Sequence, residues 1–195
     1  MEKNEVFEFV RKMKARDHVI LLYTDPKDKY EVLFGYLKAG LEKSEAAAYV
    51  ASEETPEQVK EAMQEFGIDV KRYEQKGTLK IIDYRDWYII GGKFDISKTI
   101  SLWKSLLKDA EAGGFKGLRV TGEMSCFFKH KMINELVEYE QALHRTLEIP
   151  LTAICAYNTE AITKEKGEIE LLLDLIKAHS TVIIMGPKAG LVKTI

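Results

Sequence analysis

The sequence has little cysteine, little proline and no long apolar run. Cys126 and Cys155 are the only cysteines among 195 residues, and both lie in apolar surroundings, so we expect a reduced pair rather than a disulfide. No apolar stretch reaches the roughly 18 residues that a membrane-spanning helix requires. Residues 1–17 are charged throughout and lack the apolar core of a signal peptide. These absences predict a cytoplasmic protein with no membrane partner.

A large excess of one charge is also absent. The chain carries 29 basic and 31 acidic residues, for a net charge of −2, so we expect no general attraction to nucleic acid. Asparagine and glutamine are scarce beside many lysines and glutamates, a bias that is typical of heat-adapted proteins and compatible with an archaeal or thermophilic source.

Strand and helix patterns alternate along nearly the whole chain. Such alternation predicts one α/β domain over residues 1–195, with a three-layer, mostly parallel sheet flanked by helices. Strands are expected at 18–23, 46–52, 78–82, 118–121, 151–157 and 181–185, and helices at 3–15, 29–43, 55–66, 97–112, 129–147 and 160–178.

The loop after the first expected strand, at residues 23–30, stands where a nucleotide-binding P-loop would be. A working loop has two glycines, a lysine and a Ser or Thr, which together cradle phosphates and Mg²⁺. Here Tyr23 and Asp28 replace the glycines, Lys29 keeps the lysine, and Tyr30 replaces the hydroxyl residue. The scaffold of an ATPase is therefore predicted, without its phosphate-binding chemistry.

In open parallel sheets, ligands bind outside the carboxyl ends of the strands, where the strand order reverses. The expected strand ends bring carboxylates and tyrosines to one edge of the sheet. We therefore predict a ligand site whose walls include Tyr23, Asp25, Glu53, Glu54, Asp83, Glu123 and Tyr157.

These motifs carry a resemblance that covers essentially the whole chain. The segments HVILLY (18–23), AAAYVASEETPEQV (46–59) and GTLKIIDY (77–84) occur in the order found in RecA-like ATPases of the KaiC type. With GLRVTGEM (117–124) and Cys155-Ala156-Tyr157, the chain more specifically resembles the MEDS domain, a sensory domain of methanogens, methylotrophs and a dichloromethane-responsive regulator. The resemblance implies a KaiC-like fold with a degenerate P-loop, used to sense small organic molecules or to relay signals. Ser125-Cys126 departs from the family, where an aromatic residue is expected.

Several residues at the predicted ligand site allow two interpretations. Lys29 could contact a nucleotide, but a lysine that opens a helix is more often a solvated charge. Glu53 and Glu54 match the carboxylates that activate water in working ATPases, yet without a phosphate cradle they are better suited to a polar ligand or a helix cap. Asp25 precedes a proline and could be a turn or cap residue.

We expect structural roles for several other polar residues. Arg119 falls inside a buried strand, and Glu123 or Glu140 is the expected partner of its guanidinium. Cys126 and His130 are four residues apart, but no further metal ligands are spaced near them, so no metal site is predicted. We expect His18 and His179, at the amino ends of strands, to make structural hydrogen bonds.

An aromatic segment at residues 84–94 allows two further alternatives. Tyr84, Trp87, Tyr88 and Phe94 could form a lid over an apolar ligand or a hydrophobic strip for dimerisation.

The sequence thus predicts a non-catalytic sensory or signalling module without a cofactor. Its expected partners are a small organic molecule and a signalling protein or a second copy of the chain. The alternative is a weak nucleotide-binding protein or ATPase with an unconventional P-loop, in which Lys29 would contact the nucleotide.

Overall fold

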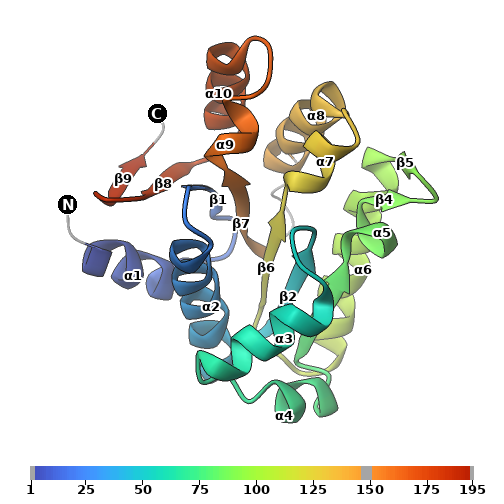
Figure 1. Ribbon diagram of the computed structural model, residues 1–195. Helices are drawn as coiled ribbons and strands as arrows, with labels where there is room; N and C mark the ends of the chain where they lie inside the picture. Colours follow the sequence, from blue (N-terminus) through green and yellow to red (C-terminus); the bar gives the residue numbers. More distant parts are fainter. Residues whose placement is uncertain (1–2, 146–150, 194–195) are drawn as a thin grey trace.

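The computed structural model describes residues 3–145 and 151–193, in which a seven-stranded sheet lies between two layers of helices (Figure 1). The strand order is β3-β2-β6-β7-β1-β8-β9, and every pairing is parallel except that of β8 with β9. The predicted α/β architecture is confirmed. The strands are β1 (His18–Tyr23), β2 (Ala46–Ala51), β3 (Leu79–Asp83), β6 (Leu118–Glu123), β7 (Leu151–Asn158), β8 (Thr181–Met185) and β9 (Gly190–Lys193), and a separate hairpin is formed by β4 (Ile89–Ile90) and β5 (Lys93–Phe94).

The helices form two layers, one on each face of the sheet. The first face is covered by α1 (Lys3–Lys12), α2 (Pro26–Glu42), α3 (Pro56–Glu65) and α4 (Val70–Gln75). The second face is covered by α5 (Tyr84–Trp87), α6 (Ile96–Ala112), α7 (Ser125–Lys129), α8 (Ile133–Arg145), α9 (Thr159–Ile162) and α10 (Glu168–Lys177). Among the described residues, no helix combines the length and the apolarity needed to cross a bilayer.

The central strands are buried on both faces, which explains their continuous apolar sequences. In β1, every residue is buried. Ile20 and Leu22 pack against the second helix layer, whereas Val19, Leu21 and Tyr23 pack against the first. This alternation divides the interior into two cores and decides which side chains can meet.

The predicted start of α3 is confirmed, because its capping residues form the expected hydrogen bonds. Thr55 and Gln58 form a reciprocal capping box at the start of α3, as the sequence predicts. The predicted helix at 129–147 is wrong at its start, because Lys131 has a positive φ of 56° and α8 begins at Ile133. The predicted end of that helix, residues 146–147, lies outside the described residues.

Three other elements differ from expectation. The predicted helix at 160–178 is divided into α9 and α10, since Gly167 has a φ of 78° at the start of α10. The short helix α4, capped by Asp69, and the antiparallel edge strand β9 were not predicted.

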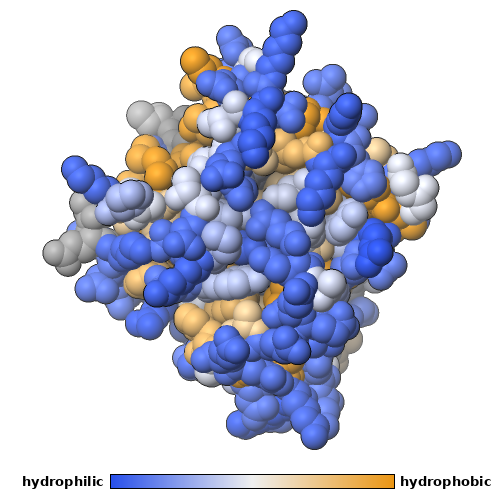
Figure 2. Space-filling model, viewed as in Figure 1, coloured by the Kyte–Doolittle hydropathy of each residue, from blue (hydrophilic) through white to orange (hydrophobic). Residues whose placement is uncertain are grey.

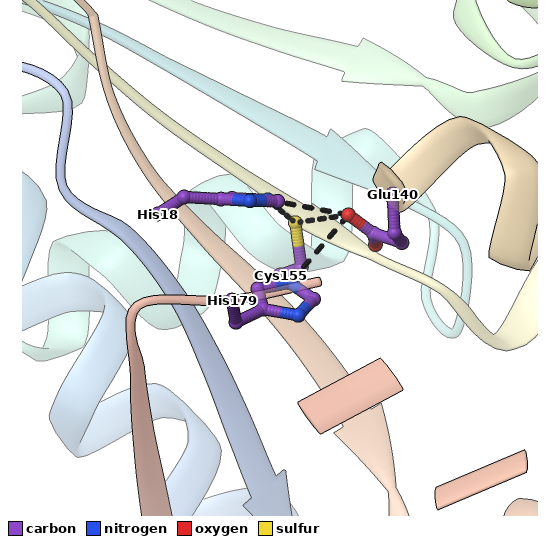
Figure 3. Close-up of side chains that lie close together, drawn as sticks. All are labelled: His18, Glu140, Cys155 and His179. Carbon is purple, nitrogen blue, oxygen red and sulfur yellow. Dashed lines mark hydrogen bonds and ion pairs between the residues drawn. The ribbon is translucent and has the colours of Figure 1, made fainter. Parts of the chain in front are cut away.

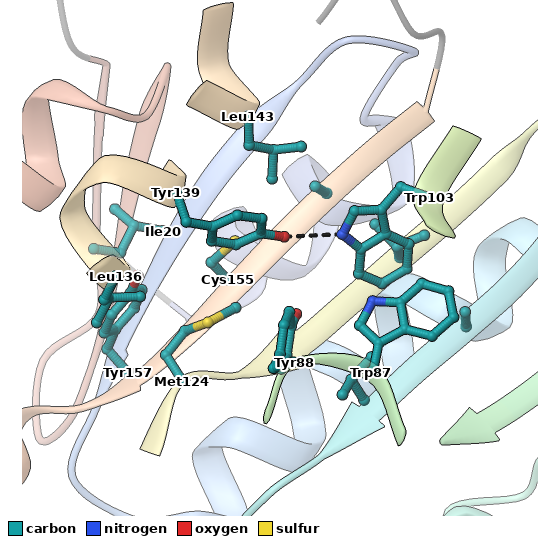
Figure 4. Close-up of a cluster of buried hydrophobic side chains, with 14 of the residues drawn as sticks. Ile20, Trp87, Tyr88, Trp103, Met124, Leu136, Tyr139, Leu143, Cys155 and Tyr157 are labelled. Atoms are coloured by element: carbon teal, nitrogen blue, oxygen red, sulfur yellow. Dashed lines mark hydrogen bonds between the residues drawn. The ribbon is translucent and has the colours of Figure 1, made fainter. Parts of the chain in front are cut away.

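Two of the four aromatic residues at 84–94 are buried, and Tyr84 and Phe94 are partly buried. Trp87 and Tyr88 are 8% and 2% exposed and belong to the second core (Figure 4). Trp87 packs on Trp103 with ring centroids 4.5 Å apart, and Trp103 Nε1 donates to the Tyr139 hydroxyl over 2.8 Å. The expectation of an accessible aromatic surface was wrong at these two residues, because both side chains pack within the second core.

Arg119 is buried, but its carboxylate partner is Glu45 and not Glu123 or Glu140. Its Nη1 donates to the carbonyls of Val10 and Tyr36 over 3.0 and 3.1 Å. The sequence-based pairing failed because Arg119 points toward α1 and α2 at the amino end of β6. The guanidinium therefore joins both helices to the sheet.

Substitution of Gly40 tests the junction that Arg119 makes between the sheet and helices α1 and α2. A Cβ at Gly40 would lie 2.5 Å from Arg119 Cδ and 2.9 Å from Glu45 Oε2, so Gly40→Ala should lower the free energy of unfolding by about 1–3 kcal/mol in urea denaturation. Gly35→Ala is the matched control on the same helix, because nothing lies within 4 Å of its added Cβ. Helix propensity should make it neutral or stabilising by up to about 1 kcal/mol. Equal destabilisation by both variants would contradict this account of the junction.

Candidate functional site

The candidate site lies at the carboxyl ends of β1, β2 and β6. The chain leaves β2 toward β3 and leaves β6 toward β7, so the strand order reverses between these two neighbours. Such a reversal is the usual ligand position in open α/β sheets. Lys29 enters this edge from the first turns of α2, which Asp25 caps by accepting from Lys27 N over 2.8 Å.

The Lys29 ammonium is enclosed by three carboxylates. Its Nζ lies 2.6 Å from Glu123 Oε1, 2.8 Å from Glu53 Oε2 and 3.1 Å from Glu54 Oε2. The Lys29 side chain is 0% exposed, and its Nζ also lies 4.7 Å from the centre of the Tyr30 ring. The expectation that Lys29 is a solvated charge was wrong. The ammonium is internal and fully paired.

Glu123 is the innermost of the three carboxylates. Its Oε2 accepts the backbone N–H groups of Ser52 and Glu53 over 2.6 and 2.7 Å. Its Oε1 accepts from Lys29 and from the Tyr49 hydroxyl. Four donors therefore hold a carboxylate that is 0% exposed, which fixes the end of β6 to the end of β2.

Glu53 and Glu54 form the outer part of the same cluster. Glu53 Oε1 accepts hydrogen bonds from the hydroxyls of Tyr23 and Ser125. The Glu53 and Glu54 side chains are 15% and 24% exposed, so solvent reaches the cluster from their side. We call Lys29, Glu53, Glu54 and Glu123 the lysine cage.

The pKa shifts follow from burial and from this pairing. Burial alone would lower the pKa of Lys29, but the charges of Glu123 and Glu53 outweigh burial and raise it. Burial favours the neutral form of Glu53, yet Lys29 and the hydrogen bonds lower the pKa of Glu53. For Glu123, burial dominates and raises the pKa, although the charge of Lys29 opposes this. Lys29 thus remains an ammonium ion.

The residues predicted to line the ligand site do not all lie together. Tyr23, Glu53, Glu54 and Glu123 converge on Lys29, whereas three others lie apart. Asp25 is an exposed helix cap, and Asp83 caps α5 and pairs with the exposed Arg85, whose Nη2 is 2.6 Å away.

Tyr157 lies on the other face of the sheet. It pairs in register with Leu22, whose side chain points away from Tyr23, and its hydroxyl donates to Glu140. Strand alternation accounts for this separation, because residues on the two faces cannot reach one another.

Three side chains at this site were missed from the sequence. Tyr49 lies two residues before the end of β2 and shares the face of Glu123, so strand alternation could have indicated it. Ser125 occupies the position where the resemblance predicts an aromatic residue, and its small hydroxyl reaches Glu53. Lys129 Nζ donates to the Ser52 carbonyl over 2.7 Å, a contact that no local pattern indicated.

A surface depression lies at the start of α2, beside the ends of β1 and β8. It has a volume of about 400 Å³ and is lined by charged and small residues: Lys3, Thr24, Asp25, Lys27, Asp28, Glu31, Gly186 and Pro187. The face drawn in Figure 2 is mainly hydrophilic, with hydrophobic side chains in separate areas. Of the predicted wall residues, only Asp25 lines this depression.

A comparison with models of protein families identifies the family of this chain. The model of the MEDS domain, the methanogen/methylotroph, DcmR sensory domain, matches residues 17–180. The chain belongs to the MEDS family. The degenerate P-loop therefore belongs to a chain of a family described as sensory.

Curated relatives and a solved structure agree with this fold. A UPF0273 protein of Aeropyrum pernix is 30% identical over 108 residues, which cover 50% of this chain and 44% of that protein. A UPF0273 protein of Pyrococcus horikoshii is 34% identical over 87 residues, or 40% and 35% of the two chains. The chain thus spans less than half the length of these relatives. The crystal structure of a KaiC-like protein from Pyrococcus horikoshii matches with a TM-score of 0.62 and 17% identity, covering 91% of this chain and 76% of that chain.

Replacement of Lys29 should show how much this residue contributes to the stability of the protein. Lys29→Met leaves three clustered carboxylates without their cation, so we expect a loss of about 3–5 kcal/mol in the free energy of unfolding at neutral pH. Without the ammonium, mutual repulsion and burial raise the carboxylate pKa values above their unfolded values. The variant should therefore lose stability as pH rises from about 5 to 7, because its folded state must give up protons that it binds more tightly than the unfolded state.

Lys27→Met is the matched control, because Lys27 is an exposed lysine two residues earlier on the same helix. Its stability should lie within about 0.5 kcal/mol of the parent at every pH. Urea titrations at several pH values measure both variants. A Lys29→Met protein as stable as Lys27→Met would show that the cage contributes nothing.

Proposed function

We propose that this chain is a non-catalytic sensory module that binds a small organic ligand at the lysine cage and passes the signal to a protein partner. The observation that carries the proposal is the complete burial of Lys29 among Glu53, Glu54 and Glu123. In a P-loop, the lysine is available to the phosphates. Here the same position is already neutralised from within the protein.

The charge of the cage favours particular ligands. Three carboxylates face one ammonium ion, and even with nearby Lys129 the acidic groups outnumber the basic ones by three to two. Phosphate would meet net repulsion there, as would a carboxylate ligand. A small ammonium compound or an alcohol could instead donate to Glu53 and Glu54, whose side chains are partly exposed. We therefore propose a cationic or hydrogen-bond-donating organic molecule as the ligand class.

Catalysis of ATP hydrolysis is the competing function, since the chain has a KaiC-like fold. Hydrolysis requires a held phosphate, a metal ion and a carboxylate aimed at water. Glu53 and Glu54 are carboxylates of the required kind, but Lys29 pairs with both and the Tyr23 hydroxyl donates to Glu53. This arrangement supports a non-catalytic role.

The proposal predicts a selective thermal-shift profile. Methylated ammonium compounds or short alcohols should raise the unfolding midpoint in a concentration-dependent manner, whereas ATP with Mg²⁺ should leave it unchanged. Glu53→Gln/Glu54→Gln should abolish the response to the ammonium compounds, because the acceptor charges are gone. The measurement is differential scanning fluorimetry of the parent and the variant across this panel.

Glu57→Gln/Glu61→Gln supplies the matched control. It removes the same number of charges from exposed positions on neighbouring α3 and should keep the response. If ATP with Mg²⁺ stabilises the parent and the Glu53/Glu54 variant loses that effect, the chain is a nucleotide-binding protein and the proposal is wrong. Equal loss of the ammonium response in both double variants would show that only general surface charge matters.

A further inference from the structure

A second buried polar cluster lies on the opposite face of the sheet from the lysine cage. His18 opens β1, Cys155 lies within β7, Glu140 comes from α8, and His179 follows α10 (Figure 3). Cys155 is 3% exposed and the other three are at most 1% exposed. Four segments that are distant in sequence therefore deliver two imidazoles, one thiol and one carboxylate to a single point.

The distances among these groups match those of a tetrahedral metal site. Bonds of about 2.0 Å to nitrogen and oxygen and 2.3 Å to sulfur would place tetrahedral ligand atoms about 3.3–3.6 Å apart. Glu140 Oε2 lies 3.2 Å from His18 Nε2, 3.5 Å from His179 Nε2 and 3.5 Å from Cys155 Sγ. Cys155 Sγ lies 3.4 Å from His18 Nε2. All four ligand atoms lie within 4.8 Å of one another, so a small contraction completes the set.

The hydrogen bonds around the cluster orient its ligands. His179 Nδ1 lies 2.6 Å from the Leu175 carbonyl oxygen, which can only accept, so the ring proton is on Nδ1 and Nε2 faces the cluster. This bond to a backbone carbonyl is the outer contact that metal-binding histidines usually make. Glu140 Oε1 accepts from Tyr157, which leaves Oε2 as the atom directed at the other three groups.

The charges also suit a divalent cation. Within the described part of the chain, no lysine or arginine pairs with the buried Glu140 carboxylate, which contacts both imidazoles. A divalent ion with one thiolate, one carboxylate and two neutral imidazoles forms a neutral assembly, which removes the cost of an uncompensated buried charge.

We propose that His18, Glu140, Cys155 and His179 form a structural zinc site. Binding replaces the Cys155 S–H bond with a sulfur–zinc bond and releases that proton to solvent. Four protein ligands fill the tetrahedron, so the site holds no open position for catalysis. Zinc would tie β1 and β7 to α8 and to the segment before β8. From the sequence we expected only structural hydrogen bonds for His18 and His179. The proposal adds metal binding to that role.

The test uses cobalt as a spectroscopic substitute for zinc in the full chain. The protein is unfolded, freed of metal with a chelator under reducing conditions, and refolded with one equivalent of Co²⁺. We expect the strong visible bands of tetrahedral cobalt and a near-ultraviolet thiolate-to-cobalt band, both removed by added Zn²⁺. Cys155→Ala should lose the thiolate band, whereas Cys126→Ala should keep it, because Cys126 is an equally buried cysteine outside the cluster.

Histidine variants and stability give independent readouts. His179→Gln should weaken cobalt binding at least tenfold, while His144→Gln, which alters an exposed histidine beside His18, should retain it. Zinc at a hundredfold above its dissociation constant should raise the unfolding midpoint of the parent by roughly 5–10 °C. The proposal is overturned if the refolded parent shows no thiolate–cobalt band, or if Cys155→Ala retains that band. The parent spectrum decides the matter even if a variant fails to fold.

Discussion

The contact between Lys29 and Glu123 is the interaction on which the carboxyl edge of the sheet depends. Both side chains are 0% exposed, and Lys29 is the only cation that pairs with Glu123 among the described residues, so the buried carboxylate would be uncompensated without it. Glu123 also accepts the backbone N–H groups that follow β2. One carboxylate therefore fixes α2, β2 and β6 at the point where the strand order reverses. The residue that would contact phosphate in a P-loop serves here as an internal cation.

A second buried cation fixes the other end of the same layer. Arg119 lies near the amino end of β6 and donates to the Tyr36 carbonyl in α2 and the Val10 carbonyl in α1. Helix α2 is thus held near its start by Lys29 and near its end by the close approach of Gly40 to Arg119. Because both ends are fixed, movement of α2 as a whole would break the Lys29–Glu123 ion pair and the hydrogen bond from Arg119 to the Tyr36 carbonyl. Under the proposed function, we therefore expect the response to a ligand to begin outside α2.

The fold was predictable because its central strands are continuous apolar segments separated by helices with clear caps. The convergence of Tyr23, Glu53 and Glu123 was also predictable, since strand ends in a parallel sheet share one edge. Tyr157 was misplaced because strand ends alone do not say which face a side chain takes, although its pairing with Leu22 does. The cluster around Glu140 required tertiary structure, because its members come from four distant segments.

The segment that follows β2 is where a ligand would act first. Glu53 and Glu54 are partly exposed, whereas Lys29 and Glu123 are closed to solvent. A cationic ligand would compete with Lys29 for Glu54, the carboxylate with the longest of the three contacts and the greatest exposure. Loss of that contact would leave Lys29 paired with Glu123, so the sheet edge would stay intact while residues 53–55 and the start of α3 rearrange. Under the proposed function, the cage therefore has an inner pair that maintains the fold and an outer pair that responds to the ligand.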